Sequence, residues 1–195
     1  MRNLFIVGTC IVLGLAIGLL WHFRMKVRNT RAFPLQASES SPTGVYADLR
    51  NQALDGPRAE FNLPAERYPT EPWGVVMDWA LDSGYVTVAA LSDGNASVYL
   101  SSGGGSIGGR LHESIRKAAE EMVAAAAEVQ PQMDATTAHP LPQSGEVDFY
   151  LRTDAGLFTA KDTVTDLSSQ RSPFSKLGNA AQEIITRYRN IGAEK

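Results

Sequence analysis

The chain has few of the residues on which metal sites and disulfides depend. Its 195 residues include one cysteine and three histidines. One cysteine excludes a disulfide within the chain. Cys10, His22, His112 and His139 are too scattered to show the spacing of a metal site. We therefore expect no metal site and no cofactor.

Charge is absent from one long segment near the start of the chain. Leu4–Phe23 contains no charged residue. At 1.5 Å per residue, about 20 apolar residues span roughly 30 Å, which is the thickness of the hydrocarbon core of a bilayer. No Ala-x-Ala-like cleavage site follows the run. The sequence thus predicts a retained signal-anchor that partners the lipid bilayer as a transmembrane helix.

The charges beside this run predict its direction. Arg24, Lys26, Arg28 and Arg31 follow it, whereas Arg2 alone precedes it. Basic flanks stay on the cytoplasmic side, so we expect a single-pass protein with its main domain in the cytoplasm. The opposite insertion, which short anchors also adopt, is the alternative. Within the run, Gly14 and Gly18 form a small-xxx-small element, which indicates either a weak homodimer or simply the frequent glycine of such helices.

Beyond residue 31, basic charge is in deficit. All 21 acidic residues lie there with 13 of the 18 Lys and Arg, a net charge of −8. An acidic domain repels phosphate backbones, so we expect no nucleic-acid partner. Residues 32–72 hold six of the ten prolines. We predict an anchor with its basic flank over 1–31, a Pro-rich linker over 32–72 and a soluble α+β domain over 73–195.

One short helix is predicted inside the linker. Ser41-Pro42 resembles a helix start, and Gly56 could end it. Val45, Leu49 and Ala53 fall on one face. A helix this short is not stable alone, so it must dock on the domain or on the membrane surface.

The remaining domain predicts five strands and two main helices in the order βββ-α-ββ-α. Alternating apolar residues predict the strands, and spacings of three and four predict the helices. The expected strands cover 73–81, 85–91, 96–101, 147–151 and 157–161, and the expected helices cover 110–130 and 172–192. They would form one antiparallel five-stranded sheet with both helices on one face.

This layout is similar to that of the profilin-like group, which includes longin and roadblock modules. The similarity is one of element order over residues 73–191. It implies an antiparallel sheet with helices packed on it and assigns no site residue.

A glycine-rich loop is the candidate ligand-binding site. Its residues that could contact a ligand are Gly103, Gly104, Gly105, Ser106, Gly108, Gly109 and His112. Backbone N–H groups of such a loop, beside a helix N-terminus, can bind an anion. The spacing matches the dinucleotide pattern, but a hairpin strand precedes it and no parallel strand with an acid follows. Structural connection and protein-docking loop are the alternatives.

Two further polar residues, His112 and Asp78, are candidates for a functional role. His112 could act as a general acid or base, although a solvated first-turn residue is the simpler interpretation. Asp78 alternates with the apolar residues of the first strand, which predicts that it lies on a solvated face of the sheet. We predict no catalytic residue, which favours a protein that is not an enzyme but leaves the question open.

Two functions follow from these features. The preferred one is a membrane-tethered, non-catalytic binding or scaffold module with a protein partner. The alternative is a small-ligand or phosphate-binding domain, which could be an enzyme, centred on residues 103–109 and the following helix start.

Overall fold

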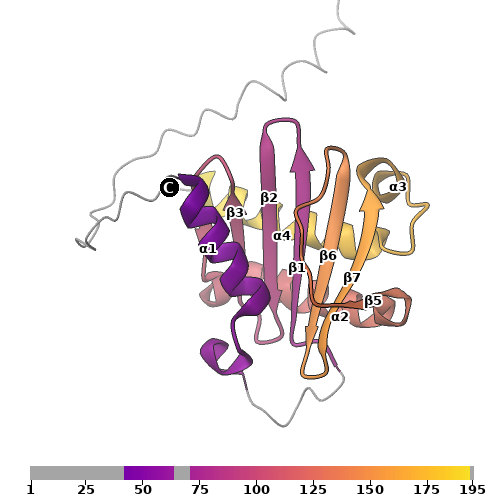
Figure 1. The fold of residues 1–195 in the computed structure, drawn as a ribbon. Helices are drawn as coiled ribbons and strands as arrows, with labels where there is room; N and C mark the ends of the chain where they lie inside the picture. Colours follow the sequence, from indigo (N-terminus) through magenta and orange to yellow (C-terminus); the bar gives the residue numbers. More distant parts are fainter. Residues whose placement is uncertain (1–41, 64–70, 194–195) are drawn as a thin grey trace, which may run out of the picture. The chain divides into compact units, whose positions relative to one another are not determined.

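The computed structural model describes residues 42–63 and 71–193 as an α+β fold with a seven-stranded antiparallel sheet (Figure 1). The strands are β1 Gly74–Leu81, β2 Gly84–Leu91, β3 Ala96–Leu100, β4 Gly105–Ile107, β5 Asp134–Thr136, β6 Glu146–Thr153 and β7 Gly156–Thr163. The α-helices are α1 Pro42–Asp55, α2 Glu113–Val129, α3 Val164–Ser168 and α4 Ser175–Ala193, and the 3-10 helices are η1 Arg58–Phe61, η3 Gly109–Leu111 and η4 Gln130–Gln132.

The strand order of the sheet is β4-β3-β2-β1-β6-β7-β5. Tight turns join β1 to β2 and β6 to β7, with Leu81 opposite Gly84 and Thr153 opposite Gly156. The central pairing is between β1 and β6 and places Asp78 directly opposite Asp148. Because neighbouring side chains of a strand alternate between faces, each central strand contributes to two different cores.

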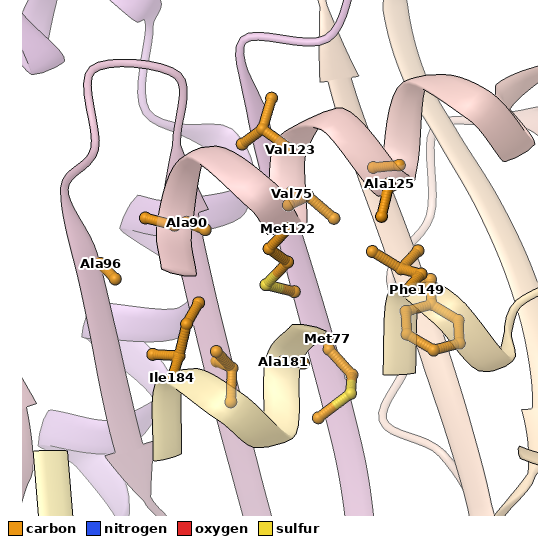
Figure 2. Close-up of a cluster of buried hydrophobic side chains, with 14 of the residues drawn as sticks. Val75, Met77, Ala90, Ala96, Met122, Val123, Ala125, Phe149, Ala181 and Ile184 are labelled. Atoms are coloured by element: carbon orange, nitrogen blue, oxygen red, sulfur yellow. The ribbon is translucent and has the colours of Figure 1, made fainter. Parts of the chain in front are cut away.

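The larger core lies between the sheet and the helices α2 and α4, as Figure 2 shows. Alternate residues of the central strands point into it, for example Val75 and Met77 of β1 and Phe149 of β6. Met122 of α2 and Ile184 of α4 face them. Both helices lie on this one face, as their apolar stripes predict.

The opposite face of the sheet is covered by α1 (Figure 1). Tyr46, Ala53 and Leu54 of α1 are buried there, together with Val76 and Tyr150 of the sheet. The helix therefore docks on the sheet, and of the predicted stripe Ala53 is buried and Leu49 packs against the same cluster, whereas Val45 does not. Val45 is 47% exposed, and the buried positions follow the spacing of one helix face.

The sheet has seven strands, so the predicted five-stranded sheet is wrong. Strands β4 and β5 contain three residues each and lie at opposite ends of the sheet. Their sequences are Gly-Ser-Ile and Asp-Ala-Thr, and glycine and aspartate have low strand propensity. Pairing with β3 and β7 therefore accounts for their extended conformation. Besides the two main helices, α2 and α4, the described residues contain α1 and the short α3. The described part of the chain therefore has four α-helices.

The structure also corrects the single-pass membrane prediction. In residues 42–63 and 71–193 no helix is both long and apolar enough to cross a membrane. The segment Leu4–Phe23, which we assigned to the bilayer from sequence, lies outside the described residues. Among the residues that the structure describes, no spanning helix supports the predicted transmembrane anchor, its orientation or the cytoplasmic location.

Candidate functional site

The glycine-rich loop forms a short hairpin between β3 and β4 and then a 3-10 turn into α2. Gly103 N–H donates to the carbonyl of Leu100 at 2.9 Å, and Gly108 N–H donates to that of Ala96 at 3.2 Å. These two N–H groups therefore have partners inside the chain and do not point to a free anion. The ligand-binding role of residues 103–109 stays a prediction.

Two glycines of the loop have steric reasons to be glycine. Gly105 has φ +144°, and a Cβ there would lie 2.2 Å from the carbonyl oxygen of Val98. A Cβ on Gly109 would lie 2.4 Å from both a methyl group of Ile115 and the hydroxyl of Tyr188. At these positions a side chain would overlap the neighbouring strand or helix.

The polar residues of the predicted site do not converge. His112 is exposed at the start of α2, and its carbonyl accepts from the N–H groups of Ile115 and Arg116. Ser106 lies in β4 opposite Val98. Asp148 lies on the central strand β6, at the pairing with β1. These three residues therefore lie on separate elements.

Two large apolar side chains beside the loop are exposed. Leu111 is 97% exposed and Ile107 is 65% exposed. Ile107 ends β4, which is the outermost described strand at its end of the sheet, and Leu111 ends η3. We call Ile107 and Leu111 the apolar patch. Exposure of an aliphatic side chain to water is less favourable than full burial by about 1.5–3 kcal/mol. The patch is therefore a candidate contact surface.

A cavity of about 140 Å³ lies between α1 and the sheet. Its lining includes Leu49 and Ala53 of α1, Ala89 of β2, Ile107 of β4 and two polar residues, Asn95 and Arg152. The side-chain oxygen of Asn95 is buried and has no hydrogen-bond partner among the described residues. The cavity thus combines apolar walls with polar groups, as small-molecule sites do.

Arg152 is a buried cation beside this cavity. It donates to the carbonyl oxygens of Ala53 at 2.9 Å and Gly56 at 2.5 Å, at the C-terminus of α1. Its guanidinium carbon lies 4.2 Å from the ring centre of Trp73. Burial lowers the pKa of Arg152 to about 10. Among the described residues, no carboxylate forms an ion pair with it.

Asp78 lies on the face covered by α1 and is fully buried, so its predicted solvated position is wrong. Arg50 of α1 holds one carboxylate oxygen, with Nε at 2.8 Å and Nη2 at 2.7 Å. Thr87 donates to the other oxygen at 2.5 Å. Because the only proton of Thr87 is used there, Tyr46 donates to the Thr87 hydroxyl at 2.8 Å. These four residues connect α1 to the sheet through hydrogen bonds.

Burial and pairing shift the pKa values of this network. Burial lowers the pKa of Arg50, but the hydrogen bonds and charge of Asp78 outweigh that effect, so the pKa is raised. Burial raises the pKa of Tyr46 to about 12. Both side chains therefore keep their protons at neutral pH, and the network holds one charge pair, Arg50 with Asp78.

A second carboxylate lies beside Asp78. Asp148 is fully buried, and one of its oxygens has no partner among the described residues. The other lies 3.3 Å from Lys161 Nζ and 3.3 Å from the Tyr150 hydroxyl. Burial raises the pKa of Asp148, and the charge of Asp78 adds to this against the opposing effect of Lys161. Asp148 is thus an incompletely satisfied acid.

The loop before β6 closes over the same network. Arg50 Nη2 donates to the carbonyl of His139 at 2.7 Å, and Tyr150 donates to that of Pro140 at 2.7 Å. The His139 ring lies 2.9 Å from Asp55 at the end of α1. One arginine therefore links α1, the sheet and this loop.

Sequence reasoning missed Arg50, Asp148 and Arg152 as members of one buried face. The available signal was that the second strand is apolar on both faces, which indicates that both faces of the sheet are covered. Tyr150 and Arg152 alternate with the core residues Phe149 and Leu151 and belong to that second face. Asp148 and Arg152 share strand β6, and the packing of α1 brings Arg50 to this face.

The described stretches 42–63 and 71–193 contain no group of three His, Cys, Asp or Glu side chains that could hold a metal ion. Comparison of the chain with protein-family models, with curated proteins and with solved structures gives no match.

Proposed function

We propose that this domain is a non-catalytic protein-binding module whose contact surface is the apolar patch. The observation that carries the proposal is the 97% exposure of Leu111 beside the 65% exposure of Ile107. The two residues are four positions apart in the chain, and exposed apolar surface is a candidate for protein contact.

The sheet edge beside the patch suggests the kind of partner. Among the described strands, β4 has a neighbour on one side only, so its outer N–H and C=O groups can accept a further strand. Main-chain pairing supplies affinity in this mode, and side-chain contacts supply specificity. The partner chemistry that fits is an extended segment with apolar side chains that contact Ile107 and Leu111.

The polar residues support binding more than catalysis. Arg50 and Thr87 already occupy the carboxylate of Asp78 under α1, and Tyr46 donates to the Thr87 hydroxyl. His112 is exposed and has no acid among its hydrogen-bond partners in the described residues. A nucleophile with an oriented base, which covalent catalysis requires, does not emerge from these contacts.

Site-specific photocrosslinking of the full chain tests the proposal. A photoreactive phenylalanine analogue replaces Leu111, and a matched control places it at Val45, which is also exposed but lies on α1. We expect a discrete higher-mass product in cells from position 111 and none from position 45. Ile107→Asp should abolish the product because it places a charge within the patch.

The same experiment on the purified chain identifies the class of partner. A product formed by the purified chain alone means that the partner is a second copy of this chain. Equal products from positions 111 and 45, or no discrete product from position 111, would contradict the proposed function.

A further inference from the structure

The charge of Arg152 is poorly compensated for its depth. The residue is 9% exposed, and its contacts are two carbonyl oxygens and the rings of Trp73 and Phe61, with the charge of Asp55 acting from farther away. Carbonyl oxygens at the end of a helix and an aromatic face both attract a cation. A buried guanidinium is nevertheless most strongly satisfied by a carboxylate, with which it can form two parallel hydrogen bonds. Two of its five N–H groups are used by Ala53 and Gly56.

The cavity beside Arg152 is large enough for a molecule. Its volume is about 140 Å³, and a cavity of roughly 150 Å³ accepts benzene. Leu49, Ala53 and Ala89 supply apolar walls, whereas Asn95 supplies a buried oxygen without a partner. A ligand that fits these groups has a short apolar body, a negative charge and one hydrogen-bond donor or bridging water.

We propose that the cavity under α1 binds a small organic acid, with its carboxylate on Arg152 and its apolar body against Ala53 and Ala89. The cavity shares Ile107 with the apolar patch but does not include Leu111, and the proposal does not rest on the proposed protein partner. It also differs from the glycine-loop site predicted from sequence, because Ile107 is the only residue of 103–109 that lines the cavity.

Thermal unfolding of the full chain with 3-methylbutanoate tests the proposal. We expect the acid to raise Tm by about 4 °C at ten times its Kd, because it binds the folded state alone. The neutral 3-methylbutanamide has nearly the same shape and should give no comparable shift. Sodium chloride at the same concentration separates an ionic-strength effect from binding.

Variants locate the effect. Ala89→Leu fills the cavity and should abolish the shift caused by 3-methylbutanoate, and Arg152→Gln should abolish it by removing the charge. Lys117→Gln is the control, because Lys117 is exposed on α2 and does not line the cavity. If Arg152→Gln does not fold, Ala89→Leu and the amide decide the question. An equal shift with the amide, no shift with the acid, or a full shift in Ala89→Leu overturns the proposal.

Discussion

At the scale of the residue, two adjacent glycines show how surroundings decide the effect of one methyl group. Gly104 and Gly105 both have positive φ, +90° and +144°. A Cβ on Gly104 would meet nothing within 4 Å, whereas one on Gly105 would lie 2.2 Å from Val98 oxygen. The first position is restricted by the backbone alone and the second by the backbone and the neighbouring strand.

Alanine substitution should separate these two causes. We expect Gly104→Ala to lower the free energy of unfolding by about 1 kcal/mol, the usual cost of a left-handed backbone for a non-glycine residue. Gly105→Ala should cost clearly more, because β4 must also move away from β3. Chemical denaturation of both variants measures the difference, and equal losses would contradict this account.

Asp148 is a residue whose charge opposes folding. Its pKa is raised in the folded state, mainly by burial, so the native state holds this proton more tightly than the unfolded state. Its contribution is therefore most favourable below the ordinary value of 3.8 and is lost as the pH rises through the raised pKa. At neutral pH the carboxylate lowers stability.

Asp148→Asn removes that charge. We expect the variant to melt at a higher temperature than the parent at pH 7, and the difference to shrink as the pH falls towards 4. Thermal unfolding over this range measures the effect, with the exposed Asp82→Asn as control. A lower Tm for Asp148→Asn at pH 7 would show that the contact with Lys161 outweighs burial.

At the scale of the element, α1 contacts the sheet through charged side chains as well as through apolar packing. Arg50 of α1 reaches Asp78 on β1, and Arg152 of β6 reaches the last carbonyl groups of α1. One of these arginines is on the helix and the other is on the sheet, and each reaches across the interface between them. The helix is only 14 residues long, and a helix of this length has little stability apart from such contacts.

A double-mutant cycle tests the role of this ion pair. Arg50→Met leaves the buried Asp78 without its cation, and loss of one partner of a buried pair costs roughly 3–5 kcal/mol. Arg50→Met combined with Asp78→Leu should recover part of the loss, because no buried charge then remains. Urea unfolding measures Arg50→Met, Asp78→Leu and the double variant. A double variant less stable than Arg50→Met would contradict this interpretation.

The elements with long apolar patterns could be predicted from sequence, and the rest could not. Met77, Phe149 and Ile184 repeat at the strand or helix spacing of their elements, and they occupy the core as expected. Strands β4 and β5 are too short to show such a pattern. Their conformation depends on pairing with the neighbouring strands, which the sequence does not reveal. The patch residues Ile107 and Leu111 belong to the predicted loop or helix, but their exposure depends on tertiary packing.

At the scale of the whole molecule, the described fold belongs to one compact unit, Glu39–Lys195. Tyr46 and Leu54 of α1 are part of the second core of this unit. The helix is therefore part of this unit, although it precedes the first strand by almost 20 residues.

Truncation tests the extent of the folding unit. A chain that begins at Glu39 should unfold cooperatively and show the near-ultraviolet circular dichroism of packed aromatic residues. A chain that begins at Gly56 should not, because Asp78 and Tyr150 would lose their cover. A cooperative transition of similar Tm in the shorter chain would show that α1 is dispensable.

The strand order has a consequence for the route by which the chain folds. Strands β1, β2 and β3 pair with their neighbours in sequence, as do β6 and β7. Pairing of β1 with β6 instead joins residues about 70 positions apart, and closure of so long a loop is entropically costly and slow. We expect the two hairpin systems to form early and independently, and their union at the centre of the sheet to limit the rate of folding.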